Sequence, residues 1–133
     1  MIVLSNSAQQ TLQPGQSLTF DLVKLHTGNA ECHREGSPAV KLRCKGIYEL
    51  GFHANVGGSA VGTVALQMEA GGEVLPETTM IVTEDTVGSL TNVSAGTLVR
   101  NCCGDYSRIT ITNTGTVAAV IAPNSAFIAR RVA

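Results

Sequence analysis

The sequence predicts an all-β protein, a jelly-roll sandwich of about ten short antiparallel strands. Three observations lead to this prediction. Residues 48–56 alternate strictly between apolar and polar side chains, short runs rich in Thr, Val and Ile recur along the chain, and Gly, Pro and Asn-Thr-Gly turns separate these runs. Helical periodicity is absent from every run, and regularly spaced short strands between turns are typical of a sandwich.

The alternation over residues 48–56 predicts the central strand of the sandwich. Successive side chains of a strand point to opposite faces of the sheet, so this strand has one apolar and one polar face. The apolar face holds Tyr48, Leu50, Phe52, Ala54 and Val56, and the polar face holds Glu49, Gly51, His53 and Asn55. We therefore expect the first set to lie in the core and the second set to face outward.

The remaining strands are predicted from shorter alternating or β-rich runs. We expect them at residues 1–4, 17–22, 38–43, 63–70, 78–83, 90–100, 107–112, 116–121 and 125–132. Residues 24–37 and 84–89 are predicted to be loops, and Gly71-Gly72 between two β-rich runs predicts a hairpin. A chain of 133 residues without a linker or an internal repeat predicts one jelly-roll domain over residues 1–133.

The composition excludes several classes of function. The net charge is −1 and no Lys or Arg run is present, so we expect no binding to nucleic acid. No apolar stretch is long enough for membrane insertion, and the N-terminus lacks the basic region of a signal peptide, so we expect synthesis in the cytoplasm. Hydrophobic residues make up 44% of the chain and charged residues only 14%, which predicts that part of the surface is buried against other subunits.

The order of the β-rich segments resembles one family of globular heads. The segments that carry the resemblance are residues 46–55, 62–72, 98–100, 108–115 and 127–130. They are similar to the trimeric jelly-roll head of the complement and tumour-necrosis-factor-like superfamily, related modules of which occur in virion proteins of phages. The Cys-His-Arg-Glu-Gly segment at residues 32–36 and the Cys-Cys-Gly turn resemble small phage and prophage proteins of Gram-positive hosts. The chain departs from the family pattern in having few aromatic residues and no stalk of its own.

The resemblance implies a homotrimer with a structural role. We expect a virion-associated protein, either a capsid decoration or the head of a head fibre, made in the host cytoplasm and carried on the virion surface. Its partners would be itself and a capsid or adaptor protein. The alternative is a head that binds a receptor or a host-surface glycan through the loops at residues 24–37 and 84–89. The chain has no Trp, whereas carbohydrate sites usually present exposed aromatic rings.

The resemblance also places residues near a symmetry axis. In the family, the sheet of the central strand lines the threefold axis, so copies of His53 and Glu49 are expected to meet there. His53 would hold a metal or an anion, or it would be a hydrogen-bonded interface histidine, and the second is the more frequent role of such a residue. Glu84, Asp85 and Asp105 fall in predicted loops, where solvated carboxylates are expected more often than a calcium site. No nucleophile, base and orienting residue form a recognisable set, so we expect no enzyme.

The four cysteines are expected to gather at one end of the sandwich. In the jelly roll, the central strand pairs antiparallel with the strand that ends at Arg100, which would bring Cys44 near Cys102 and Cys103. The loop that carries Cys32 and His33 leads into the same end. Three alternatives stay open: two disulfides, which are favoured, a structural zinc site of these cysteines with His33, and buried free thiols. We expect no other cofactor.

Overall fold

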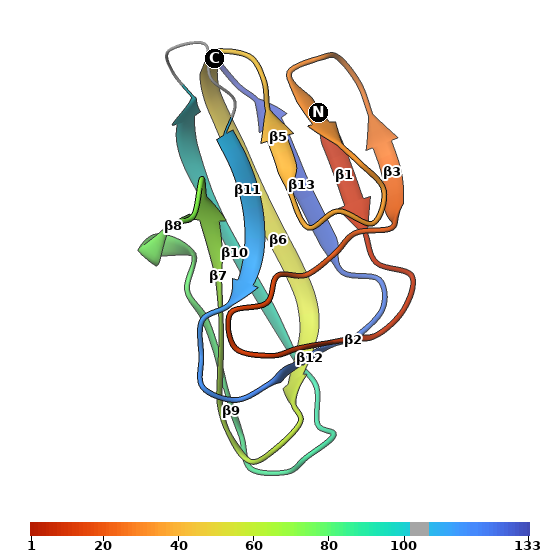
Figure 1. Ribbon diagram of the computed structural model, residues 1–133, viewed down its shortest axis with the longest axis vertical. Helices are drawn as coiled ribbons and strands as arrows, with labels where there is room; N and C mark the ends of the chain where they lie inside the picture. The colour runs from red at the N-terminus through yellow and green to blue at the C-terminus, as the bar shows by residue number, and fades with distance from the viewer. Residues whose placement is uncertain (102–106) are drawn as a thin grey trace.

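The protein folds as two antiparallel sheets packed face to face, as shown by a computed structural model that describes residues 1–101 and 107–133 (Figure 1). The predicted all-β jelly roll is confirmed. The described residues form thirteen strands rather than about ten, because several connections contain pairings of only two or three residues. These short strands are β2 (Gln10–Leu12), β4 (Glu31–His33), β5 (Val40–Leu42), β8 (Glu73–Val74) and β12 (Ala119–Ile121).

Sheet A has seven strands and contains the predicted central strand, β6 (Gly46–Gly58). On one edge, β6 pairs with β10 (Thr91–Asn101) along the whole length of β10, from Gly46 opposite Asn101 to Val56 opposite Thr91. On its other edge, β6 pairs with β13 (Ala126–Arg131) and then with β12. The sheet continues through β1 (Ile2–Ser5) to β3 (Leu22–His26), and β2 pairs with β12.

Sheet B has six strands and lies in front of sheet A in Figure 1. Its order is β4, β5, β11 (Ser107–Asn113), β7 (Gly62–Ala70) and β8, and β9 (Met80–Glu84) pairs with the other part of β7. The predicted hairpin at Gly71-Gly72 is confirmed: Ala70 pairs with Glu73, and both glycines have positive φ, 62° and 89°. A hairpin turn of two residues with positive φ favours glycine at both positions.

The core lies between the two sheets and follows the predicted alternation. The predicted apolar face of β6, from Tyr48 to Val56, is at most 2% exposed and packs with side chains of sheet B such as Leu66, Met68, Ile109 and Ile111. Phe20 and Phe127 add an aromatic contact, with ring centroids 5.8 Å apart. One cluster of buried side chains therefore joins the two sheets.

Two segments differ from the predictions. Residues 17–22 were predicted to be a strand, but only Ser17 makes a bridge, to Thr112, and the ladder begins at Leu22. The alternation there reflects burial rather than pairing, because Leu18 and Phe20 are buried while the segment runs across the side of the sandwich. Residues 24–37 were predicted to be one loop, yet they hold most of β3 and all of β4. Both are edge strands, which do not need a clean apolar face.

Glu84 also differs from its predicted environment. It is the last residue of β9 rather than the start of a solvated loop, and its residue surface is only 3% exposed. Its side chain lies against Gly58, since a Cβ built on that glycine would meet Glu84 Cγ at 3.3 Å. The Oε1 atom is buried and has no hydrogen-bond partner.

Three buried asparagines fasten the connections between strands. Asn113 donates from Nδ2 to the carbonyls of Leu12 and Val117 and accepts from the Gly115 amide, each at 2.9 Å. Asn6 and Asn101 do the same for other connections: Asn6 donates to Ala8 and Ala122, and Asn101 donates to Leu42 and Cys44. These side chains satisfy backbone groups that no sheet ladder reaches. In the described part of the chain, no helix is long and apolar enough to cross a membrane.

Candidate functional site

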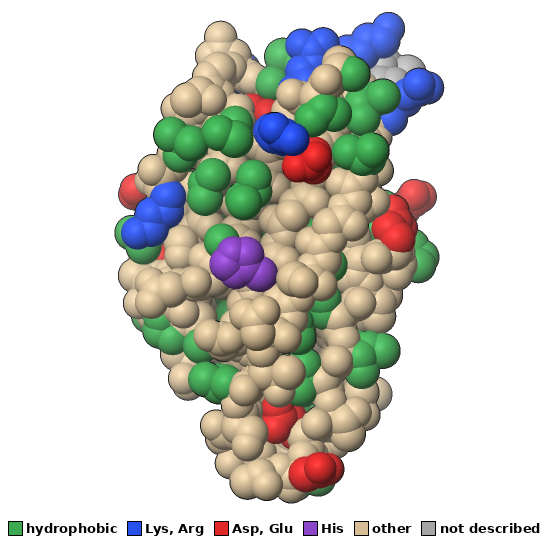
Figure 2. Space-filling model, turned by 180° about the vertical axis from the view of Figure 1, so that it is seen from behind, with side chains coloured by type: hydrophobic (Ala, Val, Ile, Leu, Met, Phe, Trp, Pro, Cys, Tyr) green, Lys and Arg blue, Asp and Glu red, His purple; other side chains and the backbone are tan. Residues whose placement is uncertain are grey.

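The outward side of sheet A forms a continuous surface, which we call the A face. Residues directly opposite one another in an antiparallel ladder point to the same side, so the register defines this face. It comprises Val3, Leu25, Ile47, Glu49, Gly51, His53, Asn55, Asn92, Ser94, Gly96, Leu98, Arg100, Ala126, Ile128 and Arg130. Figure 2 shows this side of the molecule: hydrophobic side chains gather over its upper half around an opposite-charge pair, and a histidine lies near the centre.

A shallow trough lies at the middle of the A face. Gly51 and Gly96 are opposite one another across β6 and β10, and together with Glu49 and Leu98 they line a hollow of about 440 Å³. A Cβ built on Gly51 would meet no atom within 4 Å, so glycine is not required there by the packing of this chain. Glycine inside a strand often marks a place where another backbone or a ligand approaches closely.

The charged residues of the A face include Glu49, Arg100 and Arg130, and two of these form an ion pair. Glu49 and Arg130 lie opposite one another, with Arg130 Nε 3.2 Å from Oε1 and Nη2 3.3 Å from Oε2 of the carboxylate. Both side chains are half exposed, so the pair contributes at most about 1 kcal/mol to stability. His53 is exposed and lies between Ala126 and Ser94 in the register. The alternation thus places His53 and Glu49 on one face, and their approach to a threefold axis stays a prediction.

Of the four cysteines, the structure describes Cys32 and Cys44, and both are free, half-buried thiols. Cys32 is opposite Lys41, three residues before Cys44, which puts the two Cα atoms about 10 Å apart. A disulfide needs Cα atoms closer than about 7 Å, so these two cysteines do not pair with one another. Cys102 and Cys103 lie outside the described residues.

The neighbourhood of Cys44 agrees with the predicted strand pairing. Asn101, the last residue of β10, pairs with Gly46 and donates from Nδ2 to the Cys44 carbonyl at 3.0 Å. The Tyr48 hydroxyl donates to the same carbonyl at 2.6 Å and accepts from the Cys44 amide at 3.2 Å. Burial raises the pKa of Tyr48. Whether the cysteines form disulfides or bind zinc stays a prediction.

Two members of the predicted zinc set, Cys102 and Cys103, lie outside the described residues, so the zinc site stays a prediction. Among the described residues, no group of three or more His, Cys, Asp or Glu side chains could hold a metal. Both ring nitrogens of His33 face backbone carbonyls: Nδ1 is 2.9 Å from the Ala39 carbonyl and Nε2 is 2.9 Å from the Phe20 carbonyl.

His33 therefore links the end of β4 to the two segments that carry Phe20 and Ala39. Its ring also stands edge-on to the Phe20 ring, at a centroid distance of 6.2 Å and an angle of 76°. Carbonyl oxygens only accept hydrogen bonds, so which of the two contacts is a hydrogen bond depends on the tautomer of the ring.

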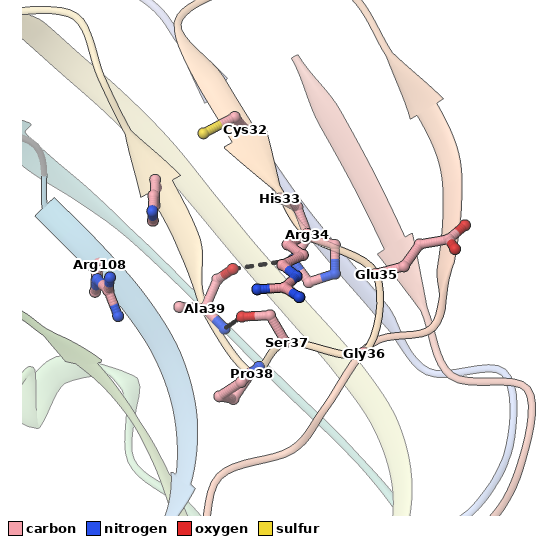
Figure 3. A pocket seen from close by; sticks show the side chains of 10 residues that line it. Cys32, His33, Arg34, Glu35, Gly36, Ser37, Pro38, Ala39 and Arg108 are labelled. Carbon is pink, nitrogen blue, oxygen red and sulfur yellow. Dashed lines mark hydrogen bonds between the residues drawn. The ribbon is translucent and has the colours of Figure 1, made fainter.

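A pocket of about 630 Å³ opens beside His33, and we call it the basic pocket. Its wall includes three cationic side chains, Arg34, Lys41 and Arg108, which come from the loop after β4, from β5 and from β11. In Figure 3, Arg108 projects from β11 on one side and Arg34 lies over the loop on the other, whereas Glu35 points away. The sequence alone does not predict this pocket, because residues 34, 41 and 108 meet only through the pairing of β5 with β11.

Outside these two surfaces, Asp21 anchors the segment before β3. It accepts from the Ser7 amide at 2.8 Å and from the Ser7 hydroxyl. These bonds favour the carboxylate and lower the pKa of Asp21. The predicted calcium ligand Asp105 lies outside the described residues, and Asp85 is exposed beside the buried Glu84.

Comparisons with known proteins find structural relatives only. No protein-family model matches the chain, and no curated protein sequence matches it. The globular domain of zebrafish complement 1qA covers 98% of both chains at 15% identity, with a TM-score of 0.67. Eiger TNF from S. frugiperda covers 99% of this chain and 91% of its own at 12% identity, with a TM-score of 0.77.

A third solved structure belongs to another class of protein. PRD1 vertex protein P5 covers 99% of this chain and 96% of its own at 15% identity, with a TM-score of 0.58. Similarity at these identities concerns the arrangement of strands and not the residues of a site. The chain therefore has the jelly-roll fold shared by complement 1q and TNF globular domains and by this vertex protein.

Proposed function

We propose that this chain is the globular head of a homotrimeric, non-catalytic structural protein on a virion surface, as a capsid decoration or as the head of a head fibre. The observation that carries the proposal is the A face, over whose upper half exposed hydrophobic side chains gather around an opposite-charge pair (Figure 2). Exposed apolar surfaces of this kind mark interaction sites. A second and third copy of the chain would cover it, with His53 and Glu49 close to the symmetry axis.

The place on a virion is supported by the fold. One protein with this fold is a vertex protein, which makes a structural role on a particle compatible with the strand arrangement. Such a head would act by shape and would bind a capsid or adaptor protein through one end of the trimer. It would be made in the host cytoplasm and carried on the finished particle.

Native mass spectrometry tests the assembly with two matched variants. Leu98 lies on the A face and is 59% exposed, whereas Ile81 lies on β9 of sheet B and is 62% exposed. We expect wild type and Ile81→Glu at three times the chain mass of 13.8 kDa, and Leu98→Glu at the mass of one chain. A monomeric wild type would contradict the proposal, as would equal dissociation of both variants. Repeating the wild-type measurement with reductant and with chelator tests, from the change in mass, whether the cysteines form disulfides or bind a metal.

A second candidate function is recognition of a receptor or glycan, and the basic pocket favours it. The predicted recognition loop at residues 24–37 includes strands, but its last part, from Arg34 to Ser37, lines the pocket. The other predicted loop, residues 84–89, begins with the buried Glu84 and lines none of the pockets described above. A glycan array probed with wild type and with an Arg34→Gln variant tests this candidate, which requires a signal that the substitution removes.

A further inference from the structure

We propose that the basic pocket binds the oxyanion of an acidic saccharide, namely a sulfate, phosphate or carboxylate group. This inference deepens the second candidate function and rests on it. The homotrimer is tested by mass and not by ligand binding, so failure of one leaves the other standing. The pocket lies on sheet B, so the A face and the ligand do not compete for the same surface.

The first argument is the arrangement of positive charge. Lys41 and Arg108 are directly opposite one another in the ladder of β5 and β11, so their Cβ atoms are about 4.5 to 5.5 Å apart on the same face. The guanidinium of Arg108 lines the pocket from β11, and that of Arg34 approaches from the loop after β4, so an anion in the pocket would be attracted from two segments.

The second argument is that the two arginines of the pocket have no carboxylate partner among the described residues. In residues 1–101 and 107–133, no carboxylate forms an ion pair with Arg34 or Arg108. Glu35 lines the rim of the pocket but points away from it in Figure 3. Each guanidinium presents a planar set of N–H donors that matches two oxygens of one oxyanion, which makes arginine the preferred partner of such groups.

The third argument is the rigidity of the loop that carries Arg34. His33 holds it to the Phe20 and Ala39 carbonyls, and the Gly36 amide donates to the Phe20 carbonyl at 2.9 Å. The Ser37 amide donates back to the Arg34 carbonyl at 2.9 Å, which closes a turn. A pocket wall that is ordered before binding loses less conformational entropy when a ligand binds than a flexible wall does.

The size and lining of the pocket favour a saccharide over nucleic acid. A volume of about 630 Å³ lies in the range of small-ligand sites. Nucleic-acid surfaces carry extended stripes of Lys and Arg, whereas here three cations converge in one pocket on a chain of net charge −1. Among the described residues that line the pocket, His33 is the only one with an aromatic ring, so the acidic group rather than ring stacking would give the affinity.

Isothermal titration calorimetry tests the inference with two double variants of equal charge change. Arg34→Gln with Arg108→Gln empties the pocket of its guanidinium groups, and Lys24→Gln with Arg43→Gln removes two exposed cations outside it. The probes are a sulfated disaccharide, a phosphorylated disaccharide, a uronic-acid disaccharide, inorganic phosphate, inorganic sulfate and a neutral disaccharide. We expect at least one acidic disaccharide to bind wild type, with a Kd raised about tenfold or more in the pocket variant and less than about twofold in the control.

Several results would overturn the inference. Equal weakening in both variants would mean that only the net charge attracts the probe. If inorganic phosphate or sulfate bound as tightly as the disaccharides, the pocket would recognise the anion alone and not a saccharide. Binding of a DNA duplex lost in the same variant would replace the saccharide by nucleic acid, and no binding of any acidic probe would end the proposal. Circular dichroism establishes beforehand that both variants keep the wild-type fold.

Discussion

Replacing Asn113 by Ala should destabilise the fold strongly, although the residue lies far from both functional surfaces. The side chain is fully buried and makes three hydrogen bonds of 2.9 Å, two to the carbonyls of Leu12 and Val117 and one from the Gly115 amide. A hydrogen bond contributes about 1 kcal/mol net, and a buried group left without a partner costs about 1 to 3 kcal/mol. Three such groups give an expected loss of about 3 to 5 kcal/mol.

Urea unfolding followed by circular dichroism measures this loss, at one protein concentration because assembly shifts the apparent stability. Asn113→Asp sharpens the test: the carboxylate still accepts from Gly115, but it faces two carbonyls that it can no longer donate to. It should therefore be at least as destabilising as Asn113→Ala at neutral pH. Thr114→Ala, an exposed neighbour, should change the stability by less than about 0.5 kcal/mol. A loss below about 1 kcal/mol for Asn113→Ala would refute the reasoning.

Three further predictions use other sites. Gly51→Arg should keep the circular dichroism spectrum of wild type, because space is open around a Cβ there, yet it should abolish the trimer in analytical ultracentrifugation; an intact trimer contradicts this. Burial raises the pKa of Tyr48 above 10.0, so the neutral hydroxyl stabilises the fold fully below about pH 10 and less as the pH rises further. The urea midpoint should therefore decline less with rising pH in Tyr48→Phe than in wild type. Glu84→Gln removes a buried charge whose Oε1 has no partner and should raise stability by about 1 kcal/mol, whereas the exposed Glu73→Gln should not; a destabilised Glu84→Gln variant would refute that account.

The alternation of side chains was sufficient to predict the parts of the fold that face one core. The strand at residues 48–56 was found with the correct inward and outward sets, because a strand with one face in water must alternate. The same rule failed for β3 and β4, which lie at sheet edges and have little apolar surface to bury. It also failed at residues 17–22, where Leu18 and Phe20 are buried without pairing in a ladder.

The candidate site was only partly predictable, for a different reason. The outward position of His53 and Glu49 follows from local alternation, but the ion pair of Glu49 with Arg130 depends on the register between β6 and β13. The basic pocket depends on the register between β5 and β11, whose residues are far apart in sequence. Registers of this kind are set by long-range packing, which one sequence does not display.

The two faces of the sandwich suit two different tasks because their surfaces differ in chemistry. The A face has one ion pair, Glu49 with Arg130, an exposed Arg100 near the end of β10, and a trough floored by Gly51 and Gly96, a surface that another polypeptide can cover with little charge to bury. In the basic pocket, by contrast, Arg34 has no carboxylate partner among the described residues. Covering this unpaired charge with another protein surface would cost free energy, whereas binding an anion from solution would be favourable. A trimer built through the A face would present three such pockets outward at once. Weak binding of one acidic group at each pocket would then combine into firm attachment to a polyanionic surface.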